Sequence, residues 1–175
     1  MKIEKEILSA AVTNTRQNLA DLLEKQAVLL IFLRHFGCVF CREAMADIAK
    51  LRPEIEKKGV QIVFVHFGDS VTAKKFFKKF KLETILHIED GDLKLYEYFG
   101  LKKASNSELF GLKVWMRGLS EGVFFKYGAG FPGATDGFQM PGVFLLDKGE
   151  IKASFIHEST ADRPDYLELA ACCVV

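Results

Sequence analysis

Two cysteines separated by two residues, Cys38 and Cys41, are the residues whose type and spacing best permit chemistry in this sequence. An apolar run at 27–33 precedes them and is typical of a buried strand. Apolar residues at three- and four-residue steps follow, which is typical of an amphipathic helix. Free N–H groups and the positive dipole end at the start of a helix stabilise a thiolate, and a second thiol one turn away can close a disulfide. The sequence therefore predicts a redox site where the strand leads into the helix.

The order of the pair predicts a role for each cysteine. Cys38 is expected to be the attacking thiol, because it lies at or just before the helix start, more exposed and nearest to free N–H donors. Cys41 lies one turn further along the apolar stripe and is expected to resolve the mixed disulfide. The intervening Val39 and Phe40 supply neither a proline nor a positive charge, so they do not indicate whether the pair oxidises or reduces its substrate.

Metal binding and inert thiols are the alternatives for the same pair. A structural zinc site needs four ligands, and the only other cysteines are Cys172 and Cys173, beside the C-terminus. We therefore predict no metal site and no cofactor. The terminal pair is expected to be buried or frayed, with a second resolving pair as the alternative. The last four residues match a prenylation box only superficially, because no polybasic run precedes them.

Composition limits the class of partner and the compartment. The 175 residues carry 24 Lys and Arg against 23 Asp and Glu, so no charged surface for nucleic acid or an anionic membrane is indicated. The longest apolar run is too short to span a bilayer, and the first residues alternate in charge where a signal peptide would be apolar. A cytoplasmic protein is predicted, and in a reducing compartment a CxxC pair is more often catalytic or metal-binding than structural.

The elements that must position the cysteines alternate between helix and strand, which predicts one domain with a mixed sheet covered on both faces. Helices are expected at 14–26, 38–58, 70–80, 92–99, 107–126 (one or two) and from about 162–164. Thr13 or Asn14 is expected to cap the first of them and Ser70 the third, and Pro53 is expected to kink or break the second. Strands are expected at 27–34, 60–66, 84–88, 142–147 and 151–156, with a Lys148-Gly149 turn joining the last two.

Four segments carry a resemblance to a known family: residues 32–43, 51–54, 95–101 and 136–147. Over residues 14–171 the chain resembles the peroxiredoxin-like AhpC/TSA group, which includes the selenoprotein L-like proteins. The resemblance implies a thioredoxin-like α/β fold, with a mixed central β-sheet, helices on both faces and an N-terminal helical extension. It also implies that Pro141 is cis and faces the dithiol, with Met140 offering its backbone to an extended substrate. Phe40 is the third residue expected to contact substrate.

The resemblance and the dithiol together favour a thiol–disulfide oxidoreductase that uses Cys38 and Cys41. Its expected partners are a protein or low-molecular-weight thiol reductant and a disulfide substrate, and the protein is expected to be a monomer or homodimer. A thiol peroxidase that reduces hydrogen peroxide or organic hydroperoxides is the first alternative, with Arg34 or Arg117 polarising the peroxide. A non-enzymatic thioredoxin-like binding module is the second alternative.

The peroxidase alternative lacks the motif that the resemblance implies. Peroxiredoxins carry Thr or Ser three residues before the reactive cysteine and Pro four residues further back. Aligned on Cys41, these places hold Cys38 and Arg34, and aligned on Cys38 they hold His35 and Ile31. Neither alignment recovers the motif, so the resemblance supports the scaffold better than it supports peroxide reduction.

Three further groups each have two interpretations. His35 and His66 lie at the carboxyl ends of predicted strands, the edge of the sheet where ligands bind. Either histidine could alter the acidity of a cysteine, or it could simply be hydrogen-bonded or solvated without such a role. The Lys-Phe run at 74–81 is expected to turn its phenylalanines to the core and its lysines to solvent, rather than to bind membrane or nucleic acid. The third group either lines a groove beside the dithiol or only packs against it. Its members are Phe124, Phe125, Tyr127, Phe131 and Phe138.

Overall fold

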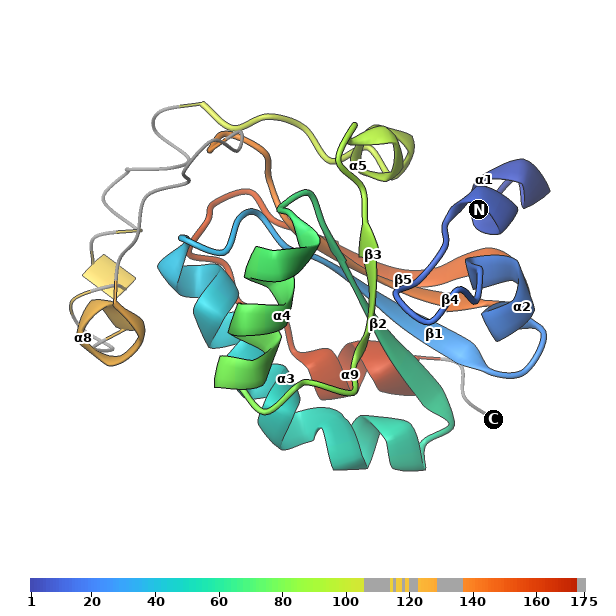
Figure 1. Cartoon of the computed structure of the whole chain (residues 1–175), viewed down its shortest axis with the longest axis horizontal. Coiled ribbons are helices and arrows are strands. Elements are labelled where there is room, and N and C mark those ends of the chain that lie inside the picture. The colour runs from blue at the N-terminus through green and yellow to red at the C-terminus, as the bar shows by residue number, and fades with distance from the viewer. Residues whose placement is uncertain (106–113, 115, 118, 120–122, 129–136, 173–175) are drawn as a thin grey trace.

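The structure is a computed structural model that describes residues 1–105, 114, 116–117, 119, 123–128 and 137–172. Its helices and strands follow the predicted alternation (Figure 1). They are α1 (Lys5–Ala10), α2 (Leu19–Leu23), β1 (Ala27–Phe32), α3 (Val39–Lys57), β2 (Val60–His66), α4 (Ser70–Lys79), β3 (Leu86–Glu89), α5 (Lys94–Tyr98), α8 (Val123–Tyr127), β4 (Gly142–Asp147), β5 (Glu150–Ile156) and α9 (Tyr166–Ala171).

The strands of the described residues form one mixed sheet in the order β3-β2-β1-β4-β5. β1 pairs in parallel with β2, and β2 in parallel with β3, because a helix crosses between the members of each pair. β4 runs antiparallel to both β1 and β5. The predicted mixed sheet and the predicted hairpin through Lys148-Gly149 are confirmed.

The central strand β1 has apolar side chains on both faces of the sheet, which explains its continuous apolar run. Leu29 and Ile31 face one core, built with α3, α4 and α9. Leu30 and Phe32 face the other, built with α1, α2 and α5. Figure 1 shows these two groups of helices on opposite sides of the sheet. The prediction of helices on both faces, with an N-terminal helical extension, is confirmed.

A tyrosine from α5 forms hydrogen bonds to the backbone at the ends of β1 and β2, the two central parallel strands. The buried hydroxyl of Tyr96 donates to the carbonyl oxygens of Leu33 and Val65. The N–H of Leu33 also donates to the Val65 carbonyl at 2.8 Å. These bonds fix where β1 ends and hence where the chain turns toward the cysteines.

The structure corrects three local predictions. The helix expected over 14–26 is only α2, capped by Asn18, because the side chain of Asn14 instead bonds the backbone at Ile85 and His87. α4 is capped by Asp69, not Ser70, because the Asp69 carboxylate reaches two N–H groups of the first turn. α3 continues through Pro53 without a break, since its apolar stripe is buried on both sides of the proline.

The aromatic side chains outside the cores have mixed outcomes. The Lys-Phe run behaves as predicted, with Phe77 buried and the lysines of α4 exposed. Phe125 and Phe138 are exposed, whereas Tyr127 is half-buried against the core that contains α3. Phe131 and most of the expected 107–126 helix lie outside the described residues.

Candidate active site

The cysteine pair lies where the sequence predicts, at the start of α3. Cys38 is the N-cap residue, with extended backbone, and Cys41 is in the first turn. Both are free thiols in the structure. Cys38 is 6% exposed and Cys41 is 4% exposed. Cys38 was expected to be the more exposed of the two, but the difference is too small to assign the attacking thiol.

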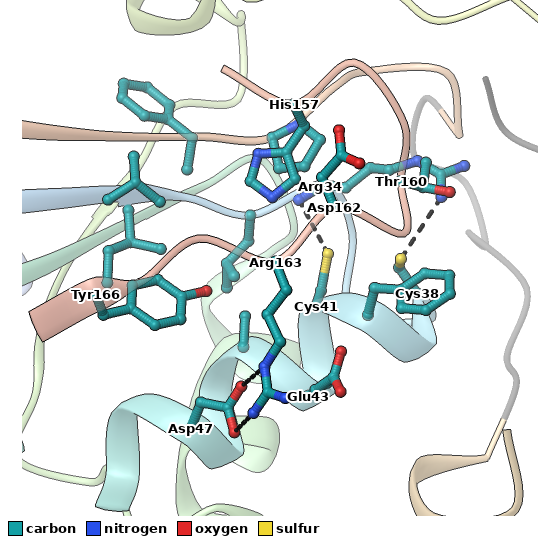
Figure 2. Close-up of a pocket in the computed structure, with 17 residues that line it drawn as sticks. Arg34, Cys38, Cys41, Glu43, Asp47, His157, Thr160, Asp162, Arg163 and Tyr166 are labelled. Carbon is teal, nitrogen blue, oxygen red and sulfur yellow. Dashed lines mark hydrogen bonds and ion pairs between the residues drawn. The ribbon is translucent and has the colours of Figure 1, made fainter. Parts of the chain in front are cut away.

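One arginine contacts both sulfurs. The guanidinium of Arg34 donates through Nη1 to Sγ of Cys38 at 3.5 Å, and the backbone N–H of Arg34 donates to Sγ of Cys41 at 3.2 Å (Figure 2). Nε of Arg34 donates to the carbonyl of Gly137 at 3.0 Å, which holds the guanidinium in place. Of the two arginines that the sequence offered for polarising a peroxide, Arg34 is the one with a hydrogen bond to Cys38.

The two cysteines have opposite acidities. A hydrogen bond from the Cys41 thiol lowers the pKa of Cys38 to about 6 and outweighs burial, which raises it, while the charge of Arg34 lowers it further. Burial raises the pKa of Cys41 well above its usual value, as do the hydrogen bond to Cys38 and the Cys38 charge. At pH 7 a pKa of about 6 leaves roughly nine-tenths of Cys38 as thiolate. This asymmetry favours Cys38 as the thiolate of the pair.

A small pocket lies beside the dithiol, between α3, the sheet and the segment after β5 (Figure 2). About 30 Å³ of it is open to the centres of water-sized molecules. Since one water needs about 10–15 Å³ by this measure, the pocket has room for two or three molecules of the size of water. Cys38, Cys41 and Arg34 all line it, so a molecule in the pocket can meet the thiolate and the guanidinium together.

The same pocket is lined by residues that the sequence analysis did not select. His157, Thr160 and Asp162 come from the segment after β5, and Tyr166 comes from the start of α9. The hairpin register pairs Gly142 with Ile156, which brings His157 opposite Pro141. Because the hairpin itself was predicted, this register is the signal that could have found His157.

The three predicted substrate contacts lie in different environments. Pro141 and Phe40 line the pocket, and the guanidinium of Arg117 lies 5.2 Å above the Phe40 ring. Met140 is fully buried, and its backbone N–H donates to the Lys102 carbonyl at 3.1 Å. The Met140 backbone is therefore bonded within the protein.

The prediction of a cis peptide at Pro141 is wrong. Every peptide bond among the described residues is trans. A short antiparallel contact holds the segment just before Pro141. Lys103 forms a β-bridge with Gln139, and the N–H of Ala104 donates to the Phe138 carbonyl at 2.7 Å. This contact, distant in sequence, directs the trans chain into β4.

Two ion pairs join α3 to the segments that cover it. Glu43 accepts from Arg117 at 2.6 Å, with both side chains buried, and Arg117 also donates to the Ala161 carbonyl. Asp47 accepts two hydrogen bonds of 2.8 Å from Arg163. Such pairs fix the orientation of the first two turns of α3, which carry the cysteines.

The histidines and the terminal cysteine that the sequence offered do not line the pocket. His66 shares a 2.9 Å hydrogen bond with His87 and contacts the carbonyl of Gly68. His35 is buried between β1 and α3, and it does not line the pocket. Cys172 is exposed at the end of α9 and does not line the pocket. In the part of the chain that the structure describes, no cluster of His, Cys, Asp and Glu could hold a metal ion.

The sequence matches a known protein family. A family model described as AhpC/TSA antioxidant enzyme matches residues 47–160, more than half of the chain. The chain belongs to the AhpC/TSA family. Membership makes it a thiol-dependent oxidoreductase of the peroxiredoxin-like group, as the resemblance implied. The matched residues begin after Cys41, so the match does not itself test the roles of the two cysteines.

Relatives agree with this family. Prostamide/prostaglandin F synthase of Danio rerio is 29% identical over 174 residues, covering 93% of this chain and 81% of the relative. Peroxiredoxin-like 2A of Bos taurus is 31% identical over 134 residues, covering 74% of this chain and 56% of the relative. Among solved structures, a cysteine-to-serine mutant of PrxQ from Xylella fastidiosa has a TM-score of 0.67 at 14% identity, covering 96% of this chain and 89% of the PrxQ chain. The similarity to PrxQ confirms the thioredoxin-like fold.

The length and hydropathy of the helices bear on whether one of them could cross a membrane. No helix among the described residues has the length and apolar content that crossing a bilayer requires. A relative in Arabidopsis thaliana, 26% identical over 163 residues (89% of this chain, 65% of the relative), is named as chloroplastic. The cytoplasmic location therefore stays a prediction.

Proposed function

We propose that this protein is a thiol peroxidase in which Cys38 reduces a peroxide and Cys41 resolves the product. The observation that carries the proposal is the Cys38 sulfur, which is buried, lines a pocket with room for only two or three waters and is contacted by the Arg34 guanidinium. Membership in a family of antioxidant enzymes supports it.

The first step is attack on the O–O bond. The Cys38 thiolate displaces one peroxide oxygen and becomes a sulfenic acid, and the leaving oxygen takes a proton to become water or an alcohol. The Arg34 guanidinium is positioned to stabilise negative charge that develops on the leaving oxygen. Because the Arg34 backbone N–H is directed at Cys41, the same residue orients both sulfurs.

The second step closes the disulfide. Sγ of Cys41 attacks Sγ of the sulfenic Cys38, the S–S bond forms, and the S–O bond breaks to release water. A small-molecule thiol then restores the dithiol by exchange. The two sulfurs share the first turn of α3, so no unfolding of the helix start is needed to bring them together.

Exchange with protein disulfides was the first hypothesis from the sequence, but burial argues against it. An incoming disulfide must bring its own sulfur to Cys38, and 6% exposure leaves no face for a folded partner. A peroxide needs only the small pocket. Family membership in turn argues against the second alternative, a non-enzymatic binding module.

The test measures peroxide consumption by the purified protein with dithiothreitol as reductant. We expect hydrogen peroxide to be consumed by the wild type and not by Cys38→Ser. In Cys41→Ser we expect the reaction to stop at a sulfenic acid that dimedone traps. A lipid hydroperoxide is included because the Danio rerio relative is named for a lipid product. Peroxide consumption that survives in Cys38→Ser would refute the assignment.

A further inference from the structure

One buried histidine in the pocket has no role in the mechanism so far. His157 is 7% exposed, and its Nδ1 has no hydrogen-bond partner within the described residues. The backbone at Pro141 and at Asp162 acts on the ring and raises its pKa, whereas no hydrogen bond to Nδ1 is formed among the described residues. Nδ1 is then the nitrogen left to act in the pocket that Cys41 also lines.

A carboxylate lies beside this imidazole (Figure 2). The backbone N–H groups of Glu158 and Ser159 each donate to Asp162 at 2.8 Å, which holds the carboxylate in place. Burial lowers the pKa of His157 to about 4, while the charge of Asp162 opposes this shift and Arg117 adds to it. His157 is therefore neutral at pH 7, with a fixed negative charge that would stabilise its protonated form.

We propose that His157 accepts the proton of Cys41 when Cys41 closes the disulfide, with Asp162 stabilising the imidazolium. A thiol, a base and an orienting carboxylate are the elements of an activated nucleophile. The proposal rests on the dithiol role given above but concerns only the second step. It addresses the main obstacle there, since Cys41 is the sulfur that burial keeps protonated.

The proton balance is closed within the pocket. The Cys41 proton passes to Nδ1 of His157, directly or through one water that the pocket can hold. Sγ of Cys41 then bonds Sγ of Cys38, and hydroxide leaves the sulfenic sulfur. The proton on His157 neutralises this hydroxide to water, so His157 ends the step unchanged.

Disulfide closure can be measured without peroxide by using 4,4′-dithiodipyridine. The Cys38 thiolate releases the first thiopyridone and forms a mixed disulfide. Attack by Cys41 then releases the second thiopyridone, and Cys41→Ser should show the first release only. In His157→Asn and His157→Leu we expect the first release to stay within twofold of wild type and the second to slow about 100-fold, the size of a general-base effect.

Two comparisons separate a proton acceptor from a structural histidine. Raising the pH from 7 to 9.5 should restore the second release in both His157 variants, because hydroxide replaces the missing base. His35→Asn is the matched control, since His35 is equally buried and its Nδ1 is also unpaired among the described residues, but it does not line the pocket. Its second release should match wild type.

The inference is overturned if the second release in both His157 variants stays within threefold of wild type. It is also overturned if His35→Asn slows equally, or if alkaline pH fails to restore the rate. Failure of the peroxidase proposal appears elsewhere, as a wild type that closes its disulfide with dithiodipyridine but does not consume peroxide.

Discussion

Arg34 donates a hydrogen bond to each cysteine, from its guanidinium to Cys38 and from its backbone N–H to Cys41. The Arg34 charge lowers the pKa of both thiols, and the backbone N–H also lowers the pKa of Cys41. The opposite shifts of the two thiols come instead from the hydrogen bond between them, which lowers the pKa of Cys38, and from burial, which raises the pKa of Cys41.

The Cys41 thiol is the largest cause of the low Cys38 pKa, so replacing it should make Cys38 less acidic. We expect the pH midpoint of Cys38 alkylation by iodoacetamide to lie near 6 in wild type and to rise by about one unit or more in Cys41→Ala. Cys41→Ser keeps a donor and should fall between them. Equal midpoints in all three proteins would contradict the assigned hydrogen bond.

The Arg34 guanidinium should contribute separately. In Arg34→Gln the alkylation midpoint should rise, because the positive charge beside the Cys38 thiolate is lost. Peroxide consumption at pH 7 should fall about 10-fold or more, since stabilisation of the leaving oxygen is lost as well. Arg34→Lys keeps the charge and should recover part of the midpoint shift. A midpoint that stays near 6 in Arg34→Gln counts against the contact.

The buried Glu43–Arg117 ion pair should matter far more than an exposed pair on the same helix. Glu43→Ala leaves the Arg117 charge buried without its carboxylate and should lower the free energy of unfolding by about 3 kcal/mol. Glu56→Ala, which removes the more exposed Arg52–Glu56 pair, is the control and should cost under about 1 kcal/mol. Urea unfolding measures both, and equal losses would refute the distinction.

The Tyr96 hydroxyl should stabilise the end of β1. Tyr96→Phe removes the hydroxyl that serves the Leu33 and Val65 carbonyls and should cost about 1–3 kcal/mol. Tyr98→Phe is the matched control, because its hydroxyl accepts an exposed bond from the Glu4 N–H, and it should cost under about 0.5 kcal/mol. If thermal unfolding gives the two variants the same stability, the bonds from Tyr96 contribute nothing.

Acid should destabilise the fold through its buried histidines. Burial lowers the pKa of His66 and of His157 to about 4, and it lowers the pKa of His87 as well. Between about pH 6.5 and 4 the unfolded chain binds protons that the folded chain does not, so stability must fall as the pH falls. Each such group contributes a slope of up to about 1.4 kcal/mol per pH unit.

Urea unfolding at several pH values between 4.5 and 7 measures this slope. His66→Gln removes one titrating group and should reduce the slope by about one proton, and His157→Gln should do the same. A slope that neither variant changes would mean that other groups govern acid unfolding.

The amino-acid sequence by itself determined the position of the dithiol and the order of the elements around it. The strand, turn and helix at 27–57 are encoded by the local spacing of apolar residues, which can be identified in the sequence without knowing how the segments pack. The hairpin through Lys148 and Gly149 is local for the same reason. Each of these features depends on residues within one or two turns of one another.

Tertiary structure alone decided what surrounds the two sulfurs. The Arg34 guanidinium is held by Gly137, 103 residues later in the chain, and His157 reaches the pocket through the register of a hairpin. The segment that leads to Pro141 pairs with residues 102–104. Contacts between segments so far apart leave no periodic trace in the sequence, because each depends on how separate elements pack.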